Sequence, residues 1–198
     1  MGRGKRAMMK NAIILHGGPD KDEYYDPNIP SESNSHWLPW LQKQLIVKDI
    51  LAVTPEVPFA FDRNWPVWQK EVERFEIGPE TILVGHSTGA GFWIKYLSIH
   101  PELNVAKVVL VAPWTDPLQE HTKNFFDDFD IDPNFVSRTK GVTVFISDDD
   151  QDDIQETVRI LRQTVKDVEY TEFQGYGHFT MGSMHTAEFP ELLVEALK

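Results

Sequence analysis

The sequence predicts a doubly wound α/β domain in which helices cover both faces of a mostly parallel, six-stranded sheet. Short apolar runs alternate with amphipathic stretches along the chain, and there is no internal repeat. The runs are apolar on successive residues, which is typical of strands buried on both faces of a parallel sheet. Because the chain has 198 residues and no linker-like segment, residues 11–198 are expected to form one domain.

Six short segments, most of them apolar runs, are predicted to be the strands. In chain order they are Asn11–Leu15, Ile50–Val53, Thr81–Val84, Lys107–Val111, Val142–Ile146 and Val168–Phe173. Apolar residues at helical spacing predict one helix from Ser35, which can cap it, to about Val47, and a second from Asn64 to about Phe75. Further helices are expected at Gly89–Ser98, which is almost wholly apolar, and at Gln119–Phe126, Pro133–Arg138, Asp153–Val165 and Pro190–Leu197.

Two connections between these elements are long. Asp20–Asn34 is a polar, Pro-rich segment and is predicted to be a loop. Ala112–Gly141 is the longest insertion, and it follows a strand at the edge where pockets form in this fold class, so it is a candidate for part of a pocket wall.

Composition excludes several classes of function. With 19 Lys and Arg against 31 Asp and Glu, the net charge is −12, which makes nucleic acids and anionic membranes poor partners. The chain has no Cys, so disulfide scaffolds, thiolate catalysis and Cys-based zinc sites are excluded. No apolar run approaches the 18 residues of a membrane span. We therefore expect a soluble, cytoplasmic protein, while its oligomeric state is open.

Residues 1–10 differ from the rest of the chain because they contain only basic charges, at Arg3, Lys5, Arg6 and Lys10. This segment lacks the apolar stretch of a signal peptide. It is predicted to be a disordered basic tail.

No metal or cofactor is expected. Asp128, Asp130 and Asp132 have the spacing that begins a calcium-binding loop, but Pro133 and Thr139 stand where that loop requires Gly and Glu. These acids are therefore interpreted as an acidic surface loop.

The third predicted strand runs into Gly85-His86-Ser87-Thr88-Gly89, and an apolar helix follows. This is a G-x-S-x-G nucleophile motif in the setting that it requires, a sharp turn between a strand and a helix. The turn holds the Ser87 hydroxyl at the carboxyl edge of the sheet. The Thr88 amide, as the first of the helix, is expected to face the negative charge that develops on a substrate carbonyl.

A serine hydroxyl needs a base, and seven histidines are available: His16, His36, His86, His100, His121, His178 and His185. His178 is the best candidate because it follows the sixth strand and so faces the same edge as Ser87, and His185 is second. The orienting carboxylate is expected after the fifth strand, in Ser147-Asp148-Asp149-Asp150. Position favours Asp150, with Asp149 as the alternative.

The loop after the first strand, His16-Gly17-Gly18, is expected to supply the second oxyanion donor. The Gly18 amide is preferred over that of Gly17, because glycine permits close approach to a substrate. His16, Gly17, His86 and Trp114 are candidate pocket residues, although a structural role for His86 and a core position for Trp114 are also consistent with the sequence.

With these motifs in place, the chain resembles the small serine hydrolases of the retinoblastoma-binding protein 9 / YdeN family, a branch of the α/β-hydrolases. The resemblance rests on the early His-Gly loop, Ser35-His36-Trp37-Leu38-Pro39-Trp40, Gly85–Gly89, Val108–Ala112, Ser147–Asp150 and Gly177-His178-Phe179. It implies an α/β-hydrolase fold without a large lid, strand order 2-1-3-4-5-6 and a Ser87–Asp150–His178 triad. The retinoblastoma-type partner is not carried over, because the motif for it needs a Cys.

The function predicted from the sequence is a cofactor-free serine hydrolase that cleaves small carboxylic esters or amides, with a carboxylesterase-like activity. Two other readings stay open. One is a binding or scaffold protein that keeps the fold with little turnover, and the other is an acyltransferase or small peptidase on the same scaffold.

Overall fold

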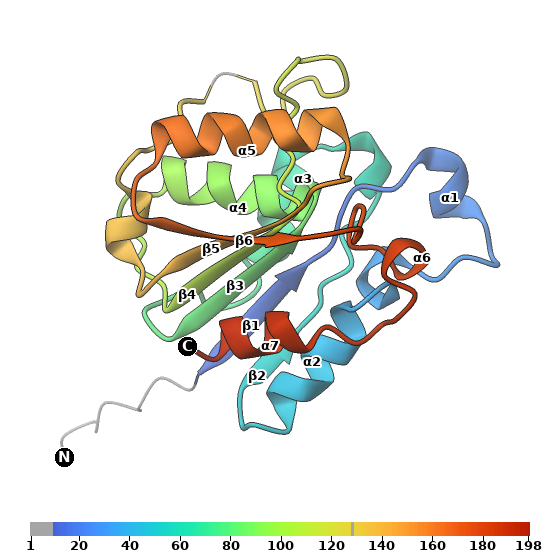
Figure 1. Cartoon of the computed structure of the whole chain (residues 1–198), viewed down its shortest axis with the longest axis horizontal. Helices are drawn as coiled ribbons and strands as arrows, with labels where there is room; N and C mark the ends of the chain where they lie inside the picture. The colour runs from blue at the N-terminus through green and yellow to red at the C-terminus, as the bar shows by residue number, and fades with distance from the viewer. Residues whose placement is uncertain (1–9, 128) are drawn as a thin grey trace.

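The described residues, 10–127 and 129–198 of a computed structural model, form a twisted sheet between two layers of helices (Figure 1). The six strands are β1 (Asn11–Leu15), β2 (Leu51–Val53), β3 (Thr81–His86), β4 (Lys107–Val111), β5 (Val142–Ser147) and β6 (Val168–Phe173). Their order is β2-β1-β3-β4-β5-β6, and every neighbouring pair is parallel. The predicted sheet and its strand order are confirmed.

The helices lie on both faces of the sheet, as expected. α3 (Trp65–Val72), α4 (Thr88–Ile99) and α5 (Asp152–Thr164) cover one face, and α2 (Leu38–Ile46) and α7 (Pro190–Ala196) cover the other (Figure 1). Two short helices, α1 (Lys21–Tyr25) and α6 (Met181–Met184), lie beyond the carboxyl ends of the strands. Short 3₁₀ turns occur at Glu32–Asn34, Ala60–Asp62 and Phe135–Arg138.

The core lies along the central strands and α4. All residues of β3, β4 and β5 are buried, and so are ten of the twelve residues of α4. A helix that is apolar on all sides is stable only when protein surrounds it, which explains why α4 packs directly behind β3. β6 lies at the edge of the sheet, and its residues are half-buried or exposed. Its burial therefore differs from the fully apolar pattern expected of the strands.

The start of α2 differs from the prediction. The helix begins at Leu38 rather than near Ser35, and its N-cap residue Trp37 makes no side-chain capping bond. Ser35 instead donates its hydroxyl to the carbonyls of Pro30 and Ser31. His36 adopts φ +57°, a left-handed conformation that a helix cannot continue through. By contrast, Asn64 caps α3 as predicted, through a bond from the Val67 amide.

The helix predicted at Gln119–Phe126 is wrong, because this segment forms turns and bends. Gln119 and Asn124 have positive φ, which a right-handed helix cannot contain, and the carboxylate of Asp116 accepts from the amides of Glu120, His121 and Thr122 and holds them in a loop. At Pro133–Arg138 only the 3₁₀ turn forms. The loop predicted at Asp20–Asn34 contains α1 and a 3₁₀ turn.

Residues 1–9 and Asp128 lie outside the described residues, so the predicted basic tail and the first acid of the calcium-like spacing are not addressed by the structure. Of the helices in the described part of the chain, none combines the length and the apolar character needed to cross a membrane.

Candidate active site

Ser87 occupies the sharp turn between β3 and α4, with φ +53° and ψ −119°. This conformation is strained for a residue with a side chain, so the surrounding structure must hold it. Four backbone hydrogen bonds do so. The Ser87 amide donates to the Val111 carbonyl at 2.9 Å, and the Ser87 carbonyl accepts from the amides of Ala90, Gly91 and Trp114.

The glycines of the motif are required by close packing around this turn. A methyl group at Gly85 would lie 2.6 Å from the backbone of Ala90, and one at Gly89 would lie 2.3 Å from the carbonyl oxygen of His16. Both distances are too short for real contacts, so only glycine lets the strand, the helix and the β1 loop meet here.

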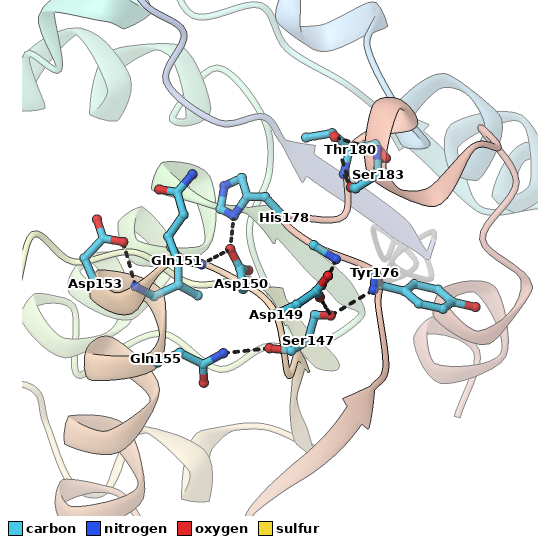
Figure 2. A network of polar contacts seen from close by, with 12 residues as sticks. Ser147, Asp149, Asp150, Gln151, Asp153, Gln155, Tyr176, His178, Thr180 and Ser183 are labelled. Atoms are coloured by element: carbon cyan, nitrogen blue, oxygen red, sulfur yellow. Dashed lines mark hydrogen bonds and ion pairs between the residues drawn. The ribbon is translucent and has the colours of Figure 1, made fainter.

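His178 and Asp150 meet at the same edge of the sheet. His178 Nδ1 lies 2.9 Å from Asp150 Oδ1, and the Asp150 side chain is fully buried while that of His178 is 23% exposed. Asp150 Oδ1 also accepts from the Gln151 amide at 2.8 Å, which orients the carboxylate (Figure 2). When Nδ1 donates its proton to a carboxylate, Nε2 is left as an acceptor, which is the tautomer that a general base needs.

The acids before Asp150 have a different partner, the backbone of the loop that carries His178. Asp148 Oδ1 accepts from the Gly175 amide, and Asp149 Oδ1 accepts from the Gly177 amide at 2.8 Å. Ser147 Oγ accepts from the Tyr176 amide and donates to Asp149 (Figure 2). The Ser147 hydroxyl and the Gly177 amide lower the pKa of Asp149. Each residue of the turn Ser147–Asp150 is therefore hydrogen-bonded to one residue of the loop Gly175–His178.

His86 contacts His178 from the other side. His86 Nε2 lies 2.8 Å from the backbone carbonyl oxygen of His178, and the two rings are 5.0 Å apart. Burial lowers the pKa of His86 well below its usual value, and the neighbouring His178 and His36 lower it further. The ring is therefore neutral, and because a carbonyl only accepts, the proton is on Nε2.

The expected oxyanion donors lie beside the turn. Thr88 is the first residue of α4, where helix amides lack an acceptor within the helix. A methyl group at Gly18 would lie 3.1 Å from Thr88 Oγ1 and 3.1 Å from Arg63 Nε, so Gly18 packs against both residues.

A cavity of about 330 Å³ brings most of the predicted residues together. Ser87, Thr88, Gly18, Trp114 and His178 all line it. The other lining residues are Asp20, Glu23, Arg63, His121, Gln151, Asp153 and Ile154. Trp114 and His121 belong to the long insertion Ala112–Gly141, which therefore forms part of the cavity wall, as predicted.

Other candidate pocket residues do not line this cavity. His16 is fully buried, with Nε2 accepting from the Val57 amide and Nδ1 bonded to the Gly17 carbonyl. Gly17 and His86 lie behind the cavity wall, where Gly17 packs on Ser87 and His86 contacts His178. His185, the second candidate base, ends α6 in a left-handed conformation and is not among the lining residues.

Sequence reasoning missed Arg63, Asp20 and Glu23 as cavity residues. Each lies in a loop or a single helical turn, where no periodic pattern indicates a direction for the side chain. Asp153, which is predicted only as the start of a helix, also lines the cavity. Within the described residues, no group of three or more His, Asp or Glu side chains is arranged to hold a metal ion.

A family model described as "Serine hydrolase" matches residues 28–195. YdeN of Bacillus subtilis (strain 168) is 26% identical over 182 residues, which cover 87% of each chain.

Solved structures with the same architecture include the ydeN gene product of B. subtilis, with a TM-score of 0.77 and 23% identity over 95% of this chain and 98% of that one. FphF of Staphylococcus aureus, a fluorophosphonate-binding serine hydrolase, has a TM-score of 0.56 and 12% identity over 96% and 84% of the two chains. At these identities the likeness shows the fold, which is the predicted α/β-hydrolase fold.

Proposed function

The chain belongs to the serine hydrolase family, and from that premise we propose that it cleaves small carboxylic esters or amides through an acyl-enzyme formed on Ser87. In this proposal Ser87 is the nucleophile, His178 the general base and Asp150 the residue that orients the base. The amides of Thr88 and Gly18 bind the oxyanion. The proposed substrate is a small molecule, and the chemistry needs no cofactor.

The proposed reaction has two stages. Ser87 Oγ attacks the acyl carbonyl carbon while His178 Nε2 takes the hydroxyl proton, and the carbonyl oxygen becomes an oxyanion facing the two amides. When the tetrahedral intermediate collapses, His178 returns the proton to the leaving alcohol or amine. Water then attacks the acyl-enzyme with His178 again as base, which releases the acid and frees Ser87.

The observation that carries the proposal is the pairing of His178 Nδ1 with the buried carboxylate of Asp150 at 2.9 Å, in a cavity that Ser87 also lines. An isolated carboxylate is costly to bury; here Oδ1 accepts hydrogen bonds from the imidazole and from the Gln151 amide, while Oδ2 has no hydrogen-bond partner among the described residues. The pairing favours Asp150 over Asp149 as the orienting acid, because Asp149 Oδ1 is bonded to the Gly177 amide.

The test is covalent labelling with a fluorophosphonate probe, together with the hydrolysis of p-nitrophenyl acetate. We expect the wild type to be labelled and active, and Ser87→Ala to lose both signals while keeping the far-UV circular dichroism of the wild type. A folded wild type that is neither labelled nor active would overturn the proposal and favour the binding-protein alternative. Product analysis with an added alcohol acceptor separates hydrolysis from acyl transfer.

A further inference from the structure

Arg63 is a cationic side chain of the candidate active site. Its side chain is half-buried and lines the cavity that contains Ser87 and His178. Within the described part of the chain, no carboxylate oxygen comes within ion-pair distance of its guanidinium, in a protein whose acids outnumber its bases by twelve. An unpaired cation that has lost part of its hydration is unfavourable in a fold unless it serves a function.

The carboxylate of Asp116 forms no ion pair with Arg63 and is bonded instead to its own loop. Its oxygens accept from the amides of Glu120, His121 and Thr122 and from the Thr122 hydroxyl. Burial lowers the pKa of Arg63, and the more distant charges of Asp20 and Asp116 oppose this effect. Arg63 stays charged at neutral pH, since arginine loses its proton only at strongly alkaline pH.

The guanidinium is held in a defined position beside the proposed oxyanion site. Arg63 Nη2 donates to the Gly18 carbonyl at 3.2 Å, and the group lies 5.1 Å from the Trp114 ring centroid. Arg63 Nε is buried and has no hydrogen-bond partner among the described residues. Arg63 and His121 also line a second cavity of about 430 Å³ between residues 61–66 and 119–124, so Arg63 lies where the two cavities adjoin.

We propose that Arg63 binds a carboxylate of the substrate, so that the preferred substrates are esters or amides that carry one carboxylate near the scissile carbonyl. This inference rests on the proposed hydrolysis at Ser87. A planar guanidinium matches a carboxylate or a phosphate. The cavity is also lined by Asp20, Glu23 and Asp153, whose charges repel a dianionic phosphate more strongly than a singly charged carboxylate.

The test compares two 4-nitrophenyl esters of equal chain length. One is mono-4-nitrophenyl adipate, whose free carboxylate makes it an anion, and the other is methyl 4-nitrophenyl adipate, in which that carboxylate is a neutral methyl ester. The readout is the ratio of kcat/KM for the anionic ester to that for the neutral ester. We expect Arg63→Gln to lower this ratio about tenfold or more. Arg63→Lys should lower it less, because lysine keeps the positive charge but lacks the paired N–H donors of the guanidinium. Asp20→Asn should raise the ratio.

Two controls separate binding from structural effects. Arg74→Gln removes an exposed arginine from the turn that follows α3 and should leave the ratio and both activities unchanged. In the wild type the ratio should fall as NaCl rises from 20 to 500 mM, which requires no variant to fold. The inference is overturned if Arg63→Gln slows both esters equally, because Arg63 would then only hold Gly18. If the wild type hydrolyses neither ester and escapes fluorophosphonate labelling, the proposed function itself fails.

Discussion

His86 Nε2 donates a hydrogen bond to the backbone carbonyl of His178 at 2.8 Å. His86 immediately precedes Ser87, so this bond joins the turn of the proposed nucleophile to the loop of the proposed base. His86 is also packed edge-on against the rings of His36 and Trp37, which fix its orientation. One neutral imidazole thus holds two parts of the candidate site that are 92 residues apart in the chain.

This contact predicts a specific effect of substitution at His86. His86→Phe keeps an aromatic ring but leaves the His178 carbonyl without this donor, which costs about 1–3 kcal/mol for a buried group. We expect kcat on p-nitrophenyl acetate to fall about tenfold with little change in KM. His86→Gln retains an N–H near the position of Nε2 and should recover part of the loss. Equal kcat values for the two variants would show that His86 acts only through packing.

Asp149 and Asp150 should be distinguishable by mutation, because they contact different parts of the same loop. Asp150→Asn removes the charge that orients and stabilises the His178 imidazolium, so kcat should fall by about 10³-fold or more. Asp149→Ala removes the acceptor for the Gly177 amide and for the Ser147 hydroxyl, and should cost about tenfold. Both variants are assayed for ester hydrolysis and for the rate of fluorophosphonate labelling. A larger loss in Asp149→Ala would reverse the proposed assignment of the two acids.

A buried ion pair lies where β4 begins, and it should make the free energy of unfolding depend on pH. Glu195 on α7 is 6% exposed, and its carboxylate accepts from Lys107 Nζ at 2.6 Å. Thr143 Oγ1 and Lys198 Nζ also donate to it. Burial alone raises the pKa of Glu195, but these hydrogen bonds outweigh it and lower the pKa to about 2.

Because this pKa is lower in the folded state than in the unfolded state, the ionised Glu195 stabilises the fold. That contribution is complete above about pH 4.5, the usual value for glutamate, and is lost as the pH falls toward 2. Urea unfolding at pH 7, 5 and 3 should show Glu195→Gln to be less stable than the wild type by about 2 kcal/mol at pH 7, with the difference shrinking at pH 3. Glu191→Gln, an exposed control on α7, should show no such trend. A difference that is constant with pH would contradict the prediction.

Much of the fold could be predicted because its signals are local. The six strands lie at the predicted places. Most are short apolar runs that are favourable only inside a sheet, and the edge strand Val168–Phe173 is the exception. The turn at Ser87 was also readable, because its glycines are required by contacts with Ala90 and His16 that any such turn imposes. Helix starts were less predictable. Ser35 has a side chain that can cap a helix, but its hydroxyl donates to the carbonyls of Pro30 and Ser31, and His36 has a left-handed conformation.

The sequence by itself determined where the six strands lie in the chain and where the sharp turn at Ser87 falls. It also placed several acids and a histidine at the carboxyl edge of the sheet. Only the tertiary structure decided which acid meets His178, because Asp148, Asp149 and Asp150 are chemically alike and differ only in the direction of their side chains. It also brought Arg63 beside Gly18, 45 residues earlier in the chain. Such pairings depend on the packing of separate loops at one edge of a sheet, and no local pattern encodes that packing.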